Sequence, residues 1–257
     1  MLKRLLKRLA LTLSFAAVLV LALYGSYFSA HQSLRLPTEG EINHYTNVSG
    51  ELREKDRQAL IKSRQSAVQV ASMEPQTGIM SASSGIYFAH QSKHYVLTTF
   101  HGILGDCLTT KIIVEEEAVS CINFTLIDID TDYIIIEIEE IETKTPLQIP
   151  TDIPKNREWT KKLSVMNQVY YTGFPNNEGP LTFGGKIIGF DSDEAIFIDS
   201  FAWAGSSGSG VFSSDGKLIG YVLALDVGET RFGIEVLENF VWVIPLFRVR
   251  WEVMLAP

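Results

Sequence analysis

The stretch Gly205-Ser206-Ser207-Gly208-Ser209-Gly210 lies between two apolar runs, residues 195–198 and 217–223, each typical of a strand. Small residues allow the backbone to adopt a positive φ and to approach a ligand closely. A serine in such a loop could present its hydroxyl beside free backbone N–H groups, as an acyl-transfer nucleophile must. A plain Gly/Ser turn is the alternative, so other parts of the sequence must distinguish the two.

From residue 67 onward the chain is composed of short apolar runs separated by turn residues. About a dozen runs are expected to be strands: 67–73, 85–89, 94–98, 111–114, 121–127, 133–139, 165–172, 184–190, 195–199, 210–212, 218–225 and 241–245. So many short strands, with few long helical periods, indicate an all-β barrel or sandwich architecture. A break with three prolines, 140–162, predicts two β lobes over about 67–140 and 160–246, and 245–254 could form a terminal helix.

The distribution of charge argues against a nucleic-acid partner. The chain carries 22 Lys and Arg against 30 Asp and Glu. All the acidic residues lie after residue 30, whereas Lys3, Arg4, Lys7 and Arg8 lie before it. The larger part of the chain would therefore repel a phosphate backbone.

Residues 9–30 form an apolar run that follows the basic head, residues 1–8. At about 1.5 Å per residue the run is long enough to span a bilayer, and the preceding positive charges place the N-terminus in the cytoplasm. We expect a single-pass signal anchor over 1–30, a juxtamembrane linker with a charged surface helix over 31–66, and an exported domain, periplasmic or extracellular, over 67–257. A cleaved signal peptide, which would give a secreted protein, is the alternative.

Two cysteines, Cys107 and Cys121, lie in the part expected to be exported, where a disulfide can persist. They flank an apolar and acidic segment that could form a strand and a turn. The spacing is compatible with a disulfide and equally with two buried free thiols.

All the histidines precede Ser207 in the sequence: His31, His44, His90, His94 and His101. This order excludes the α/β-hydrolase arrangement, in which the histidine follows the serine. The subtilisin order needs an acid before the histidine, and Asp56, the only aspartate there, falls in the charged helix. The order His, Asp, Ser remains.

Among these histidines, His101 is the candidate base because it ends the strand 95–100 and opens a short helical turn, which would hold it rigidly. His31 and His44 lie in the linker, and His90 and His94 flank an expected hairpin turn. No zinc-binding pattern accompanies them, so we expect no metal.

The candidate acids are Asp128, Asp130 and Asp132. Strand alternation would place all three on one face. Asp132 stands where the uninterrupted apolar strand begins, so it can be buried next to a histidine. Asp128 and Asp130 are expected to be solvated turn acids, with Asp130 as the second candidate.

Three motifs together resemble the chymotrypsin-like (trypsin-like) serine protease family, nearest to its bacterial HtrA/DegP-like and glutamyl-endopeptidase-like branches. They are Leu97-Thr98-Thr99-Phe100-His101, Asp132-Tyr133-Ile134-Ile135-Ile136-Glu137 and Gly205-Ser206-Ser207-Gly208-Ser209-Gly210. The chain departs from the family at Ile134, where a small residue is usual, and at Gly210, where proline is usual.

The resemblance implies two six-stranded antiparallel β-barrels, a protein or peptide substrate and no cofactor. His101 and Asp132 of the first barrel and Ser207 of the second would form a catalytic triad in the cleft between them. The N–H groups of Gly205 and Ser207 would form the oxyanion hole. Because the chain ends at Pro257, no PDZ domain of the HtrA type is expected, and the sequence does not indicate an oligomeric state.

By the same resemblance, Phe201 would form the base of the primary specificity pocket, and Leu223, Ala224 and Leu225 would form its wall. No acid or histidine lies at Phe201 or its neighbours, so we expect cleavage after small or medium apolar residues. A catalytically silent or gated binding module and an esterase on the same scaffold are the alternatives.

Overall fold

The computed structural model describes residues 52–115, 117–149, 163–191, 195–230 and 233–254, all of which belong to the compact unit Val48–Pro257. The elements are α3 (Glu54–Ser66), β1 (Ala67–Met73), β2 (Met80–His90), β3 (Lys93–Thr98), η1 (Phe100–Gly102), η2 (Cys107–Thr109), β4 (Thr110–Val114), β5 (Glu117–Asp128), β6 (Tyr133–Ile138), β7 (Leu147–Gln148), β8 (Gln168–Gly173), η4 (Pro175–Asn177), β9 (Leu181–Phe190), β10 (Ile196–Asp199), β11 (Gly210–Ser213), β12 (Leu218–Thr230), β13 (Gly233–Pro245), η5 (Leu246–Arg248) and α4 (Trp251–Met254).

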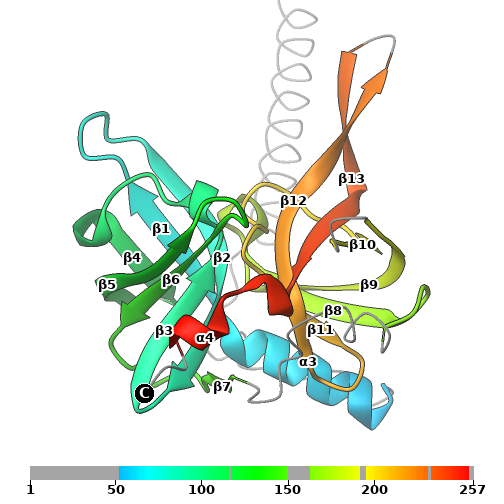
Figure 1. Cartoon of the computed structure of the whole chain (residues 1–257), viewed down its shortest axis with the longest axis horizontal. Helices are drawn as coiled ribbons and strands as arrows, with labels where there is room; N and C mark the ends of the chain where they lie inside the picture. Colours follow the sequence, from blue (N-terminus) through cyan, green and yellow to red (C-terminus); the bar gives the residue numbers. More distant parts are fainter. Residues whose placement is uncertain (1–51, 116, 150–162, 192–194, 231–232, 255–257) are drawn as a thin grey trace, which may run out of the picture. The chain divides into compact units, whose positions relative to one another are not determined.

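The strands form two barrels (Figure 1). In the first sheet the order is β1-β4-β5-β6-β3-β2-β7, and pairing of β1 with β2 closes the barrel. The second barrel is closed in the order β10-β13-β12-β11-β8-β9. The predicted all-β architecture of two six-stranded antiparallel barrels is therefore confirmed. The short strand β7, which pairs in parallel with β2, was not predicted.

The apolar run 133–136 of β6 is buried on both of its faces. Ile134 and Ile136 lie in the core of the first barrel with residues of β1, β3 and β4. Ile135 lies in a second cluster with Leu246 and Trp251, which follow β13. Alternate residues of a strand face opposite sides, so a run with both sides covered contains no polar positions. Ile134, where the family usually has a small residue, fills the barrel interior.

The two terminal helices of the described chain cross between the barrels: the N-terminal helix packs on the second barrel, and the C-terminal helix packs on the first. Helix α3 leads into β1 but packs on the second barrel, where Ser63 Oγ donates to Thr172 Oγ1 at 2.8 Å. At the other end α4 lies beside the first barrel (Figure 1). The rings of Trp251 and Phe88 pack edge to face there, with centroids 5.7 Å apart. These two segments bind the barrels to each other.

The charged helix expected within residues 31–66 is present as α3, but it packs one face on the second barrel and does not lie outside the domain. Ala59, Ser63 and Ser66 of α3 are buried, because their small side chains allow the helix to approach the barrel closely. Asp56, expected outside the domain, is only 2% exposed and pairs with Arg53 at 2.6 Å.

Two further elements differ from the expected limits. Strands β12 and β13 pair as far as Thr230 and Gly233, and the resulting ribbon extends beyond the barrel (Figure 1). The segment 245–254 forms two short turns, η5 and α4, in place of one helix.

The predicted membrane segment, residues 9–30, lies outside the described residues. Within the part of the chain that the structure describes, no helix is long and apolar enough to cross a membrane.

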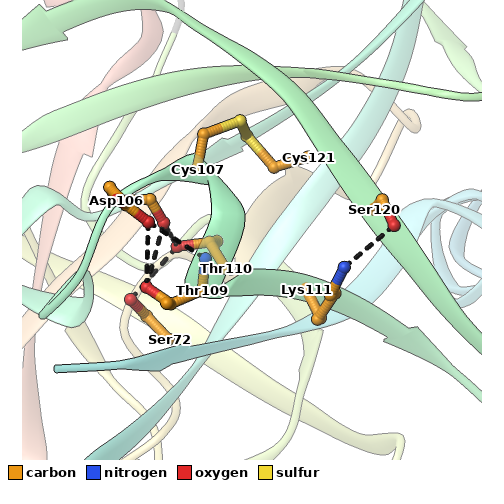
Figure 2. Close-up of a disulfide and its surroundings, with 8 residues drawn as sticks. All are labelled: Ser72, Asp106, Cys107, Thr109, Thr110, Lys111, Ser120 and Cys121. Atoms are coloured by element: carbon orange, nitrogen blue, oxygen red, sulfur yellow. Dashed lines mark hydrogen bonds between the residues drawn. A yellow bond between two sulfur atoms is a disulfide. The ribbon is translucent and has the colours of Figure 1, made fainter. Parts of the chain in front are cut away.

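A disulfide joins Cys107 of η2 to Cys121 of β5, with their Cα atoms 5.3 Å apart (Figure 2). Asp106 fixes the same turn, because its side chain accepts a hydrogen bond of 3.1 Å from Thr109 N. The hydroxyl of Thr110 donates to the carbonyl oxygen of Asp106 at 2.8 Å. The loop that follows His101 is thus fastened to the first barrel.

Candidate active site

His101 lies in η1, directly after β3, between buried neighbours. Thr99 and Gly102 are buried, and Phe100 packs against the core of the first barrel. The His101 side chain itself is 51% exposed. The backbone at this point is therefore held by packing, while the imidazole ring is accessible.

Asp132 has a left-handed backbone conformation, with φ of 54°, a region that aspartate tolerates better than most residues. It ends a tight turn in which Thr131 N donates to Asp128 Oδ1 at 3.0 Å and Asp132 N donates to Ile129 O at 3.3 Å. This turn interrupts the strand alternation. The expectation that Asp128, Asp130 and Asp132 share one face of a strand was therefore wrong.

Both oxygens of the Asp132 carboxylate bind His101. Oδ1 accepts from the backbone N–H of His101 at 2.8 Å, and Oδ2 lies 2.5 Å from Nδ1 of the ring. A carboxylate only accepts hydrogen bonds, so Nδ1 carries the proton. In the neutral ring Nε2 then has a free lone pair and can act as a base.

The turn that carries Asp132 is also held from the second barrel. The hydroxyl of Tyr221, in β12, donates to Thr131 O at 2.7 Å. Burial raises the pKa of Tyr221, and the nearby carboxylate of Asp132 raises it further, so the phenol remains a neutral donor. Arg250 pairs with Asp128 at 3.1 Å. Asp128, expected to be a solvated turn acid, is therefore held by an ion pair.

The loop with Ser207 is fixed peptide by peptide. Four successive carbonyl groups accept hydrogen bonds: Ala204 O from Asn176 N at 2.6 Å, Gly205 O from Ser84 Oγ at 2.7 Å, Ser206 O from Ser209 N at 3.1 Å, and Ser207 O from Ser84 N at 2.8 Å. The N–H groups of Ser206 and Gly208 donate to Trp203 O at 2.8 Å and to Val222 O at 2.7 Å.

Two N–H groups of this loop are left free. Among the described residues, the backbone N–H groups of Gly205 and Ser207 donate no hydrogen bond. They flank a peptide unit that is bonded at both ends, beside a serine that is only half-buried. Two free backbone donors next to a hydroxyl can stabilise a negatively charged oxygen.

Glycine is required at two positions of the loop. Gly205 has φ of 97°, and a Cβ atom there would lie 2.5 Å from Phe174 O. Gly208 has φ of 88°, and its Cβ atom would lie 2.0 Å from Ser84 O. Any side chain would force the loop away from β2 or η4.

The serine loop is attached to the strands that lead to His101. Ser84 of β2 accepts a hydrogen bond of 2.7 Å from Thr98 Oγ1, at the end of β3. The structure thus brings His101 and Asp132 into direct contact and places the Ser207 loop on the adjoining strands. In the part of the chain that is described, no hydrogen bond joins the side chains of Ser207 and His101.

Of the residues expected to form a specificity pocket, the structure describes the side chains of Phe201 and Leu223. The ring of Phe201 is 42% exposed and packs on Phe183, with ring centroids 5.6 Å apart. The Phe201 carbonyl accepts from the buried Tyr171 hydroxyl, whose pKa is raised by burial. Leu223 is half-buried. The side chains of Ala224 and Leu225 lie outside the described part.

Two other histidines, His90 and His94, are described and lie in the first barrel, whereas His31 and His44 lie outside the described residues. His94 Nδ1 lies 2.6 Å from the Tyr87 hydroxyl, which also accepts from Ile141 N at 3.1 Å. His90 and His94 flank the expected hairpin turn, whose residue Gln91 is exposed, and both histidines are half-buried. Among the described residues there is no group of three or more His, Cys, Asp or Glu side chains that could hold a metal ion.

The chain matches a known protein family and is similar to many solved structures, two of which are proteases. A family model for the trypsin-like peptidase domain matches residues 83–220. The active form of the Rv3671c protease from M. tuberculosis is 14% identical, with a TM-score of 0.55 over 73% of this chain and 79% of that chain. The serine endoprotease from Yersinia pestis is 19% identical, with a TM-score of 0.56 over 76% of this chain and 64% of that chain. At these identities the likeness establishes the fold. None of the curated proteins compared with the chain matches it.

Proposed function

The chain belongs to the trypsin-like peptidase domain family of serine endopeptidases, and we propose that His101, Asp132 and Ser207 are its catalytic triad. The observation that carries the proposal is the double hydrogen bond between the Asp132 carboxylate and His101, at 2.8 Å to the backbone and 2.5 Å to Nδ1. It fixes the imidazole in the tautomer that a general base requires.

In the proposed reaction, Ser207 Oγ attacks the carbonyl carbon of a peptide bond while His101 Nε2 takes the hydroxyl proton. The imidazolium then gives this proton to the leaving amine as the C–N bond breaks, and water hydrolyses the acyl-enzyme by the same steps in reverse. Asp132 stabilises the imidazolium. Hydrogen bonds between nucleophile and base often tighten only when substrate is bound, so Ser207 and His101 need not be bonded beforehand.

The free N–H groups of Gly205 and Ser207 would bind the oxyanion of the tetrahedral intermediate. Each such donor contributes roughly 10²–10³ in rate, because it is already oriented when the charge develops. The peptide units of the loop are each hydrogen-bonded, which supports this role, since a fixed loop reorganises little during the reaction.

For specificity, we propose cleavage after small or medium apolar residues, in a pocket formed by Phe201, Leu223, Ala224 and Leu225. Neither Phe201 nor its neighbours Ala202 and Trp203 carry a charge that could attract Lys, Arg or Glu. A peptide-library profile dominated by those residues would contradict this specificity.

We further propose that the domain is exported and anchored in the membrane by residues 9–30. The disulfide between Cys107 and Cys121 supports export, because disulfides persist in oxidising compartments. The apolar run behind a basic head supports the anchor.

The proposed activity is tested with the full chain and two serine variants. Wild-type protein should hydrolyse peptides with Ala or Val at the cleaved position, and Ser207→Ala should not. Ser214→Ala, a half-buried serine in the turn after β11, is the matched control and should retain activity. Folded wild-type protein that hydrolyses nothing would indicate a binding module, and turnover of esters but not peptides would indicate an esterase.

A further inference from the structure

Ser84 of β2 in the first barrel joins two segments of the second barrel, the serine loop and the residues before η4. Its side chain is completely buried. The hydroxyl donates to Gly205 O at 2.7 Å and accepts from Phe174 N at 2.9 Å. Its backbone N–H donates to Ser207 O at 2.8 Å. A serine hydroxyl has one proton to donate, so these contacts use its donor and one acceptor site.

These contacts determine the orientation of the peptide unit between Gly205 and Ser206. Ser84 Oγ holds the carbonyl end, and Trp203 O accepts from the N–H end at 2.8 Å. A peptide unit is planar and turns as one body. Rotation of this unit would change the relative directions of the two N–H groups on either side of it, those of Gly205 and Ser207.

Contacts outside the serine loop fix the position of the Ser84 hydroxyl. Its carbonyl oxygen accepts from Thr98 Oγ1 at 2.7 Å, so the strand cannot shift away from β3 without losing that bond. Gly173 leaves room for the hydroxyl, because a Cβ atom there would lie 2.8 Å from Ser84 Oγ. Ser84 is thus held in place independently of the loop that it contacts.

We propose that Ser84 is a positioning residue, which holds the Gly205 and Ser207 N–H groups in the geometry that binds the oxyanion. The inference rests on the proposed serine endopeptidase function. Ser84 acts through the loop and has no contact with the reacting atoms.

The change Ser84→Ala removes only the side-chain hydroxyl. It leaves Gly205 O and Phe174 N without their side-chain partner but keeps the backbone bond to Ser207 O. Since a complete oxyanion donor is worth roughly 10²–10³ in rate, partial loss of its orientation should lower kcat by about tenfold or more. KM should stay close to the wild-type value, because the residues of the proposed specificity pocket, Phe201 and 223–225, are not altered.

The experiment compares kcat, KM and the affinity for a peptidyl boronic acid, all measured on the full chain. The boronic acid forms a tetrahedral adduct with the catalytic serine and places an oxygen in the oxyanion hole, whereas the peptide product does not. Ser84→Ala should weaken boronate binding and leave product binding unchanged. Loss of packing alone would affect the two ligands alike, so equal weakening would overturn the proposal.

Two further variants complete the test. Ser63→Ala removes another buried serine hydroxyl, bonded to Thr172 at 2.8 Å and away from the loop, and should leave kcat unchanged. Ser84→Thr retains the hydroxyl and should restore boronate affinity. If Ser84→Ala does not fold, the threonine variant carries the test: preferential binding of boronate over product supports the proposal, and its loss overturns it.

Failure of this inference and failure of the proposed function give different results. Wild-type protein that neither turns over peptides nor binds boronate would contradict the proposed function itself. An active wild-type protein with a folded, equally active Ser84→Ala variant would contradict only the role of Ser84.

Discussion

The hydroxyl of Tyr221 donates a hydrogen bond of 2.7 Å to the carbonyl oxygen of Thr131, the residue before Asp132. The two residues come from different barrels, so the acid of the proposed triad is supported by the barrel that carries the nucleophile. Tyr221 is completely buried and its ring meets the edge of Tyr133 at 6.5 Å.

Tyr221→Phe should therefore lower kcat and reduce the free energy of unfolding by about 0.5–1.5 kcal/mol, the usual net value of one hydrogen bond. The ring packing is retained, so only the bond to Thr131 is lost. Urea unfolding and peptide turnover measure the two effects. Tyr170→Phe is the control: it removes a hydroxyl whose pKa is raised by burial and by the charge of Asp56, and it should leave kcat unchanged. Unchanged kcat in Tyr221→Phe would show that Asp132 needs no support from β12.

Asp132→Asn should lower kcat by about 10⁴-fold, because the amide group would favour the wrong tautomer of His101. The matched control is Asp130→Asn, which changes an exposed acid of the same turn and should leave kcat unchanged. The opposite pattern, with Asp130→Asn inactive and Asp132→Asn active, would assign the acid to Asp130. Steady-state kinetics on the full chain decide between them.

Gly205→Ala should abolish most of the activity and destabilise the protein by about 1–3 kcal/mol, since the residue combines positive φ with a close neighbour. The new Cβ atom would lie 2.5 Å from Phe174 O. Gly78, with φ of 70° and open space within 4 Å of the position that a Cβ atom would take, provides the control for backbone strain alone. Gly78→Ala should keep full activity, and comparable losses in both variants would show that crowding at Gly205 has no role.

Removal of the disulfide with the double change Cys107→Ala and Cys121→Ala should lower the free energy of unfolding by about 3 kcal/mol, the value expected for a loop of about 15 residues. Reduction of the wild-type protein should lower its melting temperature to that of the variant. If the double variant and the oxidised wild type have the same melting temperature, the disulfide contributes no stability beyond that of the Asp106 hydrogen bonds.

Several parts of the fold follow from local patterns in the sequence. The limits of β1 coincide with the expected run, because alternation and flanking turn residues mark both ends. The contact between His101 and Asp132 was expected from a strand end and a strand start, which the pairing of β3 with β6 brings together. The small residues of the serine loop likewise indicated a positive φ, which Gly205 and Gly208 both adopt.

Contacts between the barrels could not be predicted from such patterns. Ser84 and Gly205 are 121 positions apart, and Tyr221 and Thr131 are 90 positions apart. A single buried serine or tyrosine has no periodic signal that identifies its partner. The packing of helix α3 on the second barrel was not predicted for a related reason, since Ser63 and Ser66 are polar residues whose small size, and not hydrophobicity, allows burial.

The central claim, that Ser207 is a nucleophile activated by His101, is tested most directly by locating a covalent adduct. The full chain is treated with a fluorophosphonate, digested and analysed by mass spectrometry. The account predicts a single phosphonylated residue, Ser207, with no adduct in the folded His101→Ala variant. An adduct on Ser206 or Ser209, or labelling of Ser207 that persists without His101, would contradict it.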